Sequence, residues 1–332
     1  MVEPATLAQL GEAELIRRLG AYAAPGQFND DAALLQERSD RVLVLTTDVL
    51  VEGVHFSDAT VAATDLGWRA AAANLSDLAA MGCRSVVGLT VGLVAPGTTP
   101  WSWVEGVYGG LGEALDRHGG QLLGGDCSGG SQRLLAITAL GHLGSGGPIR
   151  RADGRPGDQL VCTGCHGLSR LGLALLLQEN PLPPLPEGLG ARALQAHRRP
   201  VPRFDAVAAL ERSRPPHQPW RVAGTDSSDG LAAAVALLAQ GASCTALLER
   251  DRLPVDPAMA EFPEAEEWCL GGGEDFELVL ALAPNWCDAF LGALPGSRTI
   301  GKLSEGPAEV RWADTDSALE LTCLGYRHFG SS

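Results

Sequence analysis

DLGWRAAAANLSDLAAMG, residues 65–82, has the pattern of a long helix with an acid on its buried face. Asp65 can cap the start of this helix, its alanines favour helical backbone, and Gly82 can supply a left-handed stop. By the spacing of three and four residues, one face carries Ala70, Ala73, Asn74, Asp77 and Met81. Asp77 therefore points toward packed protein, where an unpaired carboxylate is costly. We expect a cation or a hydrogen-bond donor to face it.

Other aspartates occupy places where an apolar strand or helix meets a polar or glycine-rich turn. They are Asp31, Asp48, Asp126, Asp226 and Asp229. Such element ends present functional groups in mixed α/β folds, so these aspartates can converge on one cleft. Converging carboxylates repel unless a cation neutralises them, and oxygen ligands of this kind, assisted by Thr46 and Thr47, suit magnesium. Taken singly, Asp226 or Asp229 can instead cap a helix or turn, whereas Asp77 lies in mid-helix and caps nothing.

Three glycine turns suggest phosphate chemistry, because glycine lets the backbone approach a ligand closely. They are LGGD (123–126), TGCHG (163–167) and GGGED (271–275). The segment GSRTIGKL, 296–303, resembles a P-loop, but Leu303 replaces the metal-binding Ser or Thr and no long helix follows, so we interpret it as a strand. Lys302 in this segment is the only lysine of the chain. The charge of a triphosphate would therefore be met by magnesium, backbone N–H groups and arginines such as Arg151.

Strands alternate with helices along both halves, which predicts a mixed α/β protein. The length of 332 residues suggests about two domains. GSGG at 144–147 is the best boundary, and we predict domains at 1–146 and 147–332. In the second half, SSDGLAAAVALLAQG predicts a helix whose first turn carries Ser228 and Asp229, and GGGEDFELVLAL predicts a glycine turn followed by a strand.

The composition excludes several classes of partner. Acidic residues outnumber basic ones 40 to 25, and the formal net charge of -15 repels nucleic acid and anionic membrane surfaces. An acidic start and the lack of a long apolar run predict a cytoplasmic protein without a membrane segment. Eight scattered cysteines, including the CxxC of Cys162 and Cys165, indicate reduced thiols in or beside a buried strand.

A set of motifs in a fixed order resembles the thiamine-monophosphate kinase family. They are TTDVLVEGVHF, DLGWRAAAANLSDLAAMG, LLGGD, RADGRPGD, AHRRPVPR, DSSDGL, GGGEDFELV and LGYRHF, and together they run from about Gly11 to Phe329. That family belongs to the superfamily of aminoimidazole ribonucleotide synthetase, selenophosphate synthetase and the hydrogenase-maturation dehydratase. The resemblance implies the two-domain fold of that superfamily and a homodimer whose N-terminal sheets join across the interface. It also implies transfer of the γ-phosphoryl group of ATP to thiamine monophosphate, with ATP in a cleft between the two domains.

The resemblance also assigns roles to residues of this chain. The implied magnesium ligands are Asp31, Thr46, Thr47, Asp48, Asp77, Asp126, Asp226 and Asp229. The implied contacts of ATP are Tyr108 near its base and Gly125, Asp126, Arg151 and Ser228. The implied contacts of thiamine monophosphate are His55, Glu274 and Tyr326. The first domain would bind ATP and metal and form the dimer, and the second would complete the site.

The chain departs from the family pattern in three places. Gln27-Phe28-Asn29 stands where Gly-Ile-Gly is common, Cys127 follows Asp126 where Thr is common, and Leu168 stands where an Asp often follows the TGxxG turn. None of these removes an implied metal ligand. Two other functions remain as alternatives, namely another ATP-using enzyme of the superfamily, such as aminoimidazole ribonucleotide synthetase, and a non-catalytic nucleotide- or metal-binding protein. Arg198 and Arg199 are either a solvated pair on a helix end or a phosphate contact.

Overall fold

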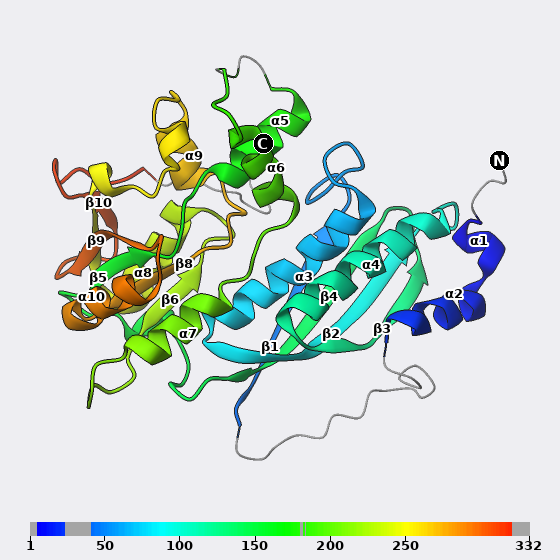
Figure 1. The fold of residues 1–332 in the computed structure, drawn as a ribbon, viewed down its shortest axis with the longest axis horizontal. Helices are drawn as coiled ribbons and strands as arrows, with labels where there is room; N and C mark the ends of the chain where they lie inside the picture. Colours follow the sequence, from blue (N-terminus) through cyan, green and yellow to red (C-terminus); the bar gives the residue numbers. More distant parts are fainter. Residues whose placement is uncertain (1–4, 24–40, 180–181, 183, 321–332) are drawn as a thin grey trace. The chain divides into compact units, whose positions relative to one another are not determined.

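The computed structural model describes residues 5–23, 41–179, 182 and 184–320. The chain divides into two compact units (Figure 1). The first unit comprises Met1–Leu78 and Ser85–Leu143, and the second comprises Ala79–Arg84 and Gly144–Ser332. Each unit contains one β-sheet of mixed strand direction together with helices, which confirms the predicted mixed α/β class.

The first unit has a four-stranded sheet in the order β1-β4-β2-β3. Its strands are β1 (Leu43–Val51), β2 (Cys83–Ala95), β3 (Gln121–Gly129) and β4 (Leu134–Leu143). β1 and β4 are antiparallel, whereas β2 and β3 are parallel and are joined by a helix, as parallel pairing requires. The helices are α1 (Leu7–Leu10), α2 (Glu12–Leu19), the short 3₁₀ helix η1 (Gly20–Tyr22), α3 (Ala63–Ala80) and α4 (Trp101–His118). α3 and α4 run side by side over one face of the sheet (Figure 1).

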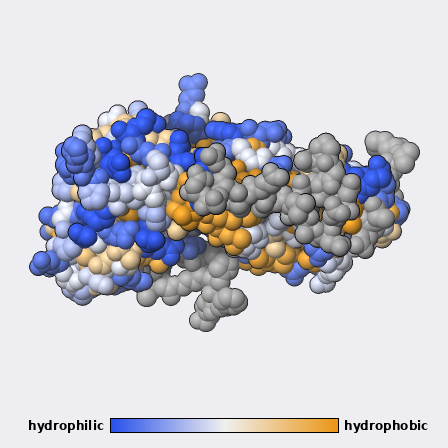
Figure 2. All heavy atoms as spheres, turned by 90° about the horizontal axis from the view of Figure 1, so that it is seen from below, coloured by the Kyte–Doolittle hydropathy of each residue, from blue (hydrophilic) through white to orange (hydrophobic). Residues whose placement is uncertain are grey.

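Alternation along β1 divides its side chains between the two faces of the sheet. Thr46 and Asp48 face α3, because the Thr46 hydroxyl and the Asp48 amide are both bonded to side chains of that helix. Leu45, Thr47 and Val49 lie on the opposite face. Leu45 and Val49 are 63% and 45% exposed, so this opposite face is apolar and uncovered along β1. Hydrophobic side chains gather on the underside of the molecule when it is seen from below (Figure 2).

Two glycines bring the backbones of α3 and α4 together. A Cβ atom on Gly67 of α3 would lie 1.9 Å from the carbonyl oxygen of Val107, and one on Gly110 of α4 would lie 1.9 Å from that of Thr64. The helices therefore pack backbone to backbone at their crossing, where no other residue type fits. The remaining inward positions of α3 are mostly alanine and leucine with almost no exposure.

The second unit has a six-stranded sheet in the order β10-β7-β9-β5-β8-β6. Its strands are β5 (Gln159–Cys162), β6 (Ala223–Asp226), β7 (Thr245–Leu248), β8 (Leu278–Leu282), β9 (Arg298–Ser304) and β10 (Val310–Trp312). Its helices are α5 (Leu168–Leu177), α6 (Leu189–Arg198), α7 (Phe204–Ser213), α8 (Leu231–Ala242), α9 (Ala265–Gly271) and α10 (Pro284–Ala293), with 3₁₀ turns η2 (Arg151–Asp153), η3 (Arg250–Arg252) and η4 (Pro257–Met259).

Helices cover both faces of this second sheet. Leu160 and Cys162 of β5 pack with α8 in one core cluster, whereas Val161 packs with α7 and α10 in another. All five residues of β8 are buried, as expected for a central strand that is covered on both faces. A smaller apolar cluster joins α5, α6 and α9.

The segment that links α3 to β2 belongs to the second unit although both of its neighbours in sequence belong to the first. Within the second unit, the amide of Ile149 donates to the carbonyl of Met81 at 3.0 Å, and that of Gly144 donates to the carbonyl of Gly82 at 3.0 Å. Arg84 forms an ion pair with Glu211 of α7 at 3.0 Å. The chain therefore passes from one unit to the other three times.

Most predicted elements are present, with two wrong helix starts. Asp65 was predicted to cap the long helix, but α3 begins at Ala63, so Asp65 lies within its first turn and is not the cap. The helix after DSSDG was predicted to include Ser228 and Asp229, but α8 begins at Leu231, because Gly230 has a φ of 106° that no helix contains. The false P-loop is the strand β9, as predicted, and Cys162 ends the buried strand β5. Within the ranges that the structure describes, no helix is both long enough and apolar enough to cross a membrane.

The crossing of α3 and α4 can be tested with alanine substitutions. We expect Gly67→Ala and Gly110→Ala to lower the free energy of unfolding by about 1–3 kcal/mol each, because the added methyl group overlaps a backbone carbonyl. Gly109→Ala and Gly112→Ala on α4 are matched controls, since nothing lies within 4 Å of the added Cβ atom. These controls should be neutral or stabilising by up to about 1 kcal/mol. Equal effects in urea unfolding for both pairs would contradict the packing.

Candidate active site

Asp77 on α3 faces a hydrogen-bond donor on the sheet. The hydroxyl of Thr46 donates to Asp77 Oδ2 at 2.6 Å. Asp77 is half-buried, so its carboxylate is neither freely solvated nor sealed in the core. The structure thus provides the donor that the sequence led us to expect, and it leaves lone pairs on Asp77 that can accept a further partner.

Asn74 fixes the position of β1 against α3. Its side-chain oxygen accepts the amide N–H of Asp48 at 3.1 Å, and its side-chain nitrogen donates to the carbonyl of Ala70 at 3.0 Å. Asn74 is completely buried, so both bonds are sheltered from water. Asp48 and Asp77 are thereby held on facing elements, and Thr46, two residues before Asp48 on β1, is bonded to Asp77. The sequence placed Asn74 on this face but gave it no role.

Thr47 and Asp126 are not brought together with this pair. The hydroxyl of Thr47 lies on the opposite face of the sheet, 2.8 Å from that of Thr138. Asp126 lies on β3, the other edge strand of the sheet, and its register partner in β2 is Gly92. Gly92 faces Ala136, which lies on the same face of the sheet as Thr47, so Asp126 also lies on the Thr47 face. Since β1 and β3 are separated by two strands, Asp48 and Asp126 lie roughly 14 Å apart across the sheet. Magnesium ligands are about 2 Å from the ion, so one ion cannot bind both aspartates of one chain.

The other predicted residues of the first unit have structural partners. His55 Nδ1 accepts the amide N–H of Val51 at 3.0 Å in the turn after β1. Tyr108 is buried on α4 with its ring 5.9 Å from that of Tyr22, and burial raises the pKa of its hydroxyl. Gly125 approaches β2 so closely that a Cβ atom would lie 1.9 Å from the carbonyl oxygen of Val91.

In the second unit, the predicted residues around DSSDG lie together at the end of β6. The hydroxyl of Ser228 donates to Asp226 Oδ1 at 3.1 Å. Arg151 donates from Nε to the hydroxyl of Thr225 at 3.2 Å, next to Asp226 in sequence. Asp229 is exposed, whereas Asp226 is buried. This end of β6 therefore offers a guanidinium group, two carboxylates and a hydroxyl.

The GGGED loop is joined to DSSDG and is strained. The amide of Glu274 donates to the carbonyl of Ser228 at 2.7 Å. Glu274 and Phe276 have φ values of 57° and 52°, a left-handed backbone that is unusual for side chains of this size. The carboxylate of Glu274 is 3.6 Å from Nδ1 of the buried His197, which also lies 3.1 Å from the hydroxyl of Ser169.

Asp275 joins the same loop to the start of α5. Its two carboxyl oxygens accept the amide N–H groups of Gly167 at 2.7 Å and Ser169 at 3.0 Å. Burial raises the pKa of Asp275 to about 7, against the lowering effect of these two N–H groups. The carboxyl group is a backbone clamp between two loops, which the motif GGGED alone did not reveal.

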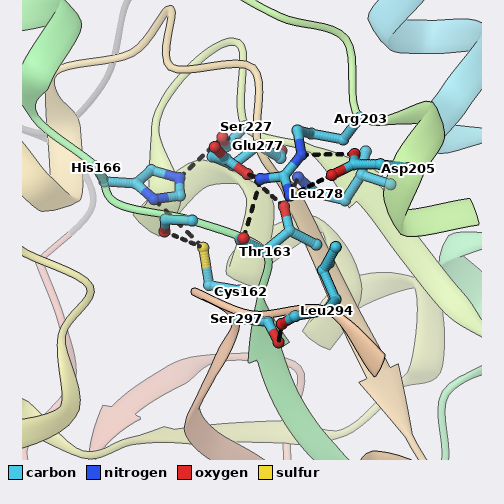
Figure 3. Close-up of polar contacts among 11 residues, drawn as sticks. Cys162, Thr163, His166, Arg203, Asp205, Ser227, Glu277, Leu278, Leu294 and Ser297 are labelled. Carbon is cyan, nitrogen blue, oxygen red and sulfur yellow. Dashed lines mark hydrogen bonds and ion pairs between the residues drawn. The ribbon is translucent and has the colours of Figure 1, made fainter. Parts of the chain in front are cut away.

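A further polar cluster lies beneath these loops (Figure 3). Glu277 is bonded to the guanidinium of Arg203 and to the hydroxyl of Thr163, and Arg203 also reaches Asp205 and the carbonyl of Thr163. His166 lies between Ser227 and Cys162. The sequence gave none of these residues a role, although the motifs TGCHG, AHRRPVPR and GGGEDFELV contain most of them.

Oxygen donors dominate both groups of predicted residues, which fits magnesium better than zinc or copper. Over the described part of the chain, no three His, Cys, Asp or Glu side chains form a ready metal cluster. Asp31 and Tyr326, together with Gln27-Phe28-Asn29, lie outside the described residues. The carboxylates of the first unit and those of DSSDG are each held by hydrogen bonds within their own unit.

Comparisons with known proteins find relatives along almost the whole chain. Residues 29–143 match the family model described as AIR synthase related protein, N-terminal domain. A thiamine-monophosphate kinase of Prochlorococcus marinus is 45% identical over 97% of both chains. The crystal structure of thiamine-monophosphate kinase from Stenotrophomonas maltophilia K279a is 32% identical, with a TM-score of 0.76 over 92% of this chain and 95% of that one. The structure of AaThiL complexed with AMPPCP and TMP is 27% identical, with a TM-score of 0.75 over 97% and 98%.

The clamp at Asp275 makes stability depend on pH. Its pKa of about 7 in the folded state is above the ordinary value of 3.8, so folding takes up a proton between these values. The free energy of unfolding should therefore fall as the pH rises from about 4 to about 7, relative to Asp275→Asn, which cannot ionise. We expect a change of more than about 1 kcal/mol, measured by urea unfolding at each pH. Asp116→Asn on the exposed side of α4 should run parallel to wild type. Parallel curves for Asp275→Asn as well would contradict the raised pKa.

Proposed function

Because the chain belongs to the thiamine-monophosphate kinase family, we propose that it transfers the γ-phosphoryl group of ATP to thiamine monophosphate, giving thiamine diphosphate and ADP. The observation that carries this proposal is the 45% identity to a thiamine-monophosphate kinase over 97% of both chains. The relative solved with AMPPCP and TMP, which matches this chain over 97% of its length, supports the same pair of ligands.

We assign magnesium binding to the oxygen groups that the two units present. Thr46, Asp48 and Asp77 form one group and Asp226 and Asp229 another, and both consist of the hard oxygen ligands that magnesium prefers. Bound magnesium would neutralise the charge of the phosphates and hold them for transfer. Asp31, Thr47 and Asp126 belong to the same assignment. Since the only lysine lies on β9, Arg151 supplies the fixed positive charge near Asp226.

The transfer needs positioning and not proton abstraction. The second pKa of a phosphate monoester is about 6, so the acceptor is largely a dianion near neutral pH and no general base has to deprotonate it. We propose direct in-line transfer, without a covalent enzyme intermediate. Ser228, Arg151 and the backbone at Gly125 hold ATP in this scheme, with Tyr108 near its base. His55, Glu274 and Tyr326 hold thiamine monophosphate, and the strained backbone of Glu274 supports a fixed side-chain direction.

We further propose a homodimer in which the sheets of the first units join. β1 is an edge strand among the described residues, and its Leu45 and Val49 are 63% and 45% exposed. A dimer also resolves the separation of the predicted metal ligands. Asp126 lies on the opposite edge of the sheet from Asp48, so joining β3 of one subunit to β1 of another would bring Asp126 of the partner subunit beside the strand that carries Thr47 and Asp48, on the face where Thr47 lies.

The metal assignment predicts that Asp48→Asn and Asp77→Asn abolish ADP formation with thiamine monophosphate. Each substitution removes a charged oxygen ligand but keeps the shape of the side chain. Asp116→Asn, an exposed change of the same chemistry on α4, should keep wild-type turnover. Wild type should form ADP only when magnesium and thiamine monophosphate are both present. Wild-type turnover in either Asp48→Asn or Asp77→Asn, with unchanged circular dichroism, would rule out the assignment.

The shared site can be tested by making mixed dimers. Asp48→Asn and Asp126→Asn homodimers should both be inactive. A dimer with one chain of each kind, purified through two different tags, should keep about half of the wild-type activity, because one of its two sites combines an intact Asp48 with an intact Asp126. If both aspartates of a site come from one chain, every site of the mixed dimer carries one substitution, and the mixed dimer stays inactive.

A further inference from the structure

In DSSDG, Ser227 lies between Asp226, a proposed magnesium ligand, and Ser228, a proposed contact of ATP. It is 1% exposed, so its hydroxyl faces the interior and not the ligand side. Its amide donates to the carbonyl of Glu277 at 2.9 Å, and its hydroxyl donates to the same carbonyl at 3.1 Å. The Ser227 hydroxyl is also 2.8 Å from Nε2 of His166. The DSSDG loop is therefore held on its buried side by the hydrogen bonds of Ser227.

His166 is itself held firmly. It is completely buried, its amide donates to the carbonyl of Pro254 at 2.8 Å, and Nδ1 of its ring is 3.3 Å from the sulfur of Cys162. Cys162 ends the central strand β5, so the ring connects the sheet to the loop (Figure 3). Burial lowers the pKa of His166 to about 4, so the ring is neutral at physiological pH and serves as a hydrogen-bonding group without charge.

The ring of His166 is completely buried, so it does not contact ATP or thiamine monophosphate directly in the proposed reaction. Its effect on the site has to pass through Ser227. A change in the backbone torsion angles of Ser227 would change the directions of the two neighbouring side chains, the carboxylate of Asp226 and the hydroxyl of Ser228. It would also disturb the carbonyl of Ser228, which accepts the amide of Glu274 at 2.7 Å.

We propose that His166 is a positioning residue that sets the directions of Asp226 and Ser228 by holding the hydroxyl of Ser227. The inference rests on the proposed function, in which Asp226 binds metal and Ser228 contacts ATP. His166, the histidine of TGCHG, would thus support nucleotide binding, and His166 and Ser227 would act through the same hydrogen bond. Of the proposed contacts of thiamine monophosphate, His55 lies in the other compact unit, whereas Glu274 is joined to this loop through the carbonyl of Ser228.

The test is steady-state kinetics of ADP formation by His166→Leu, His166→Gln, Ser227→Ala and the double variant His166→Leu/Ser227→Ala. We expect His166→Leu and Ser227→Ala to raise the KM for ATP about tenfold, as for loss of one buried hydrogen bond. The KM for thiamine monophosphate should rise less than the KM for ATP, because only Glu274 among its proposed contacts is bonded to this loop. His166→Gln keeps an N–H donor and should recover most of the loss. The double variant should be no worse than either single variant, because both break the same contact.

Ser213→Ala is the matched control. It removes the hydroxyl that accepts a hydrogen bond from the buried Trp286 at 3.2 Å, so it should lower thermal stability without changing the KM for ATP. The proposal is overturned if His166→Leu and Ser227→Ala behave like this control, or if the two single effects add in the double variant. Failure of the proposed function is a different result, since wild type would then form no ADP with thiamine monophosphate.

Discussion

The backbone contact between α3 and α4 is the constraint from which the geometry of the first unit follows. Gly67 and Gly110 let the two helices meet without intervening side chains. α3 thereby lies beside α4 on one face of the sheet, and the small residues on its inward face bring its polar residues close to β1. Asn74 and Asp77 reach that strand with short side chains only because the helix lies so near. A helix with larger inward residues would keep the same acid out of reach of Thr46.

The sequence predicted elements well wherever periodicity and composition agreed. The false P-loop is the strand β9, and Asp77 was found because an acid on an alanine face contradicts the apolar pattern. The start of α8 was misjudged because DSSDG also has the composition of a helix N-terminus, and only the backbone of Gly230 shows that the helix begins later. A local pattern does not contain that torsion angle.

Local sequence patterns do not show how strands pair or in what order they lie in a sheet. Thr46 and Thr47 are neighbours in sequence, yet only Thr46 faces Asp77, because pairing with β4 decides which alternate positions face the helices. The place of Asp126 on the far edge depends on the strand order, which has no local signature. Asp275 and His166 were missed for another reason. Their partners are backbone amides and a serine more than 60 residues away, and contacts at that range leave no spacing to recognise.

The segment Ala79–Arg84 has a consequence for the order in which the protein can be assembled during synthesis. The ribosome releases α3 and β2 early, but the residues between them find their partners only when Gly144, Ile149 and Glu211 have emerged. The first unit can thus build its sheet while this connection still lacks its native contacts. A break in the chain at Leu143 would leave six residues of the second unit attached to the wrong fragment. Neither unit is encoded by one continuous segment that ends at Leu143. A single exchange of sequence at that point would therefore not replace one complete unit.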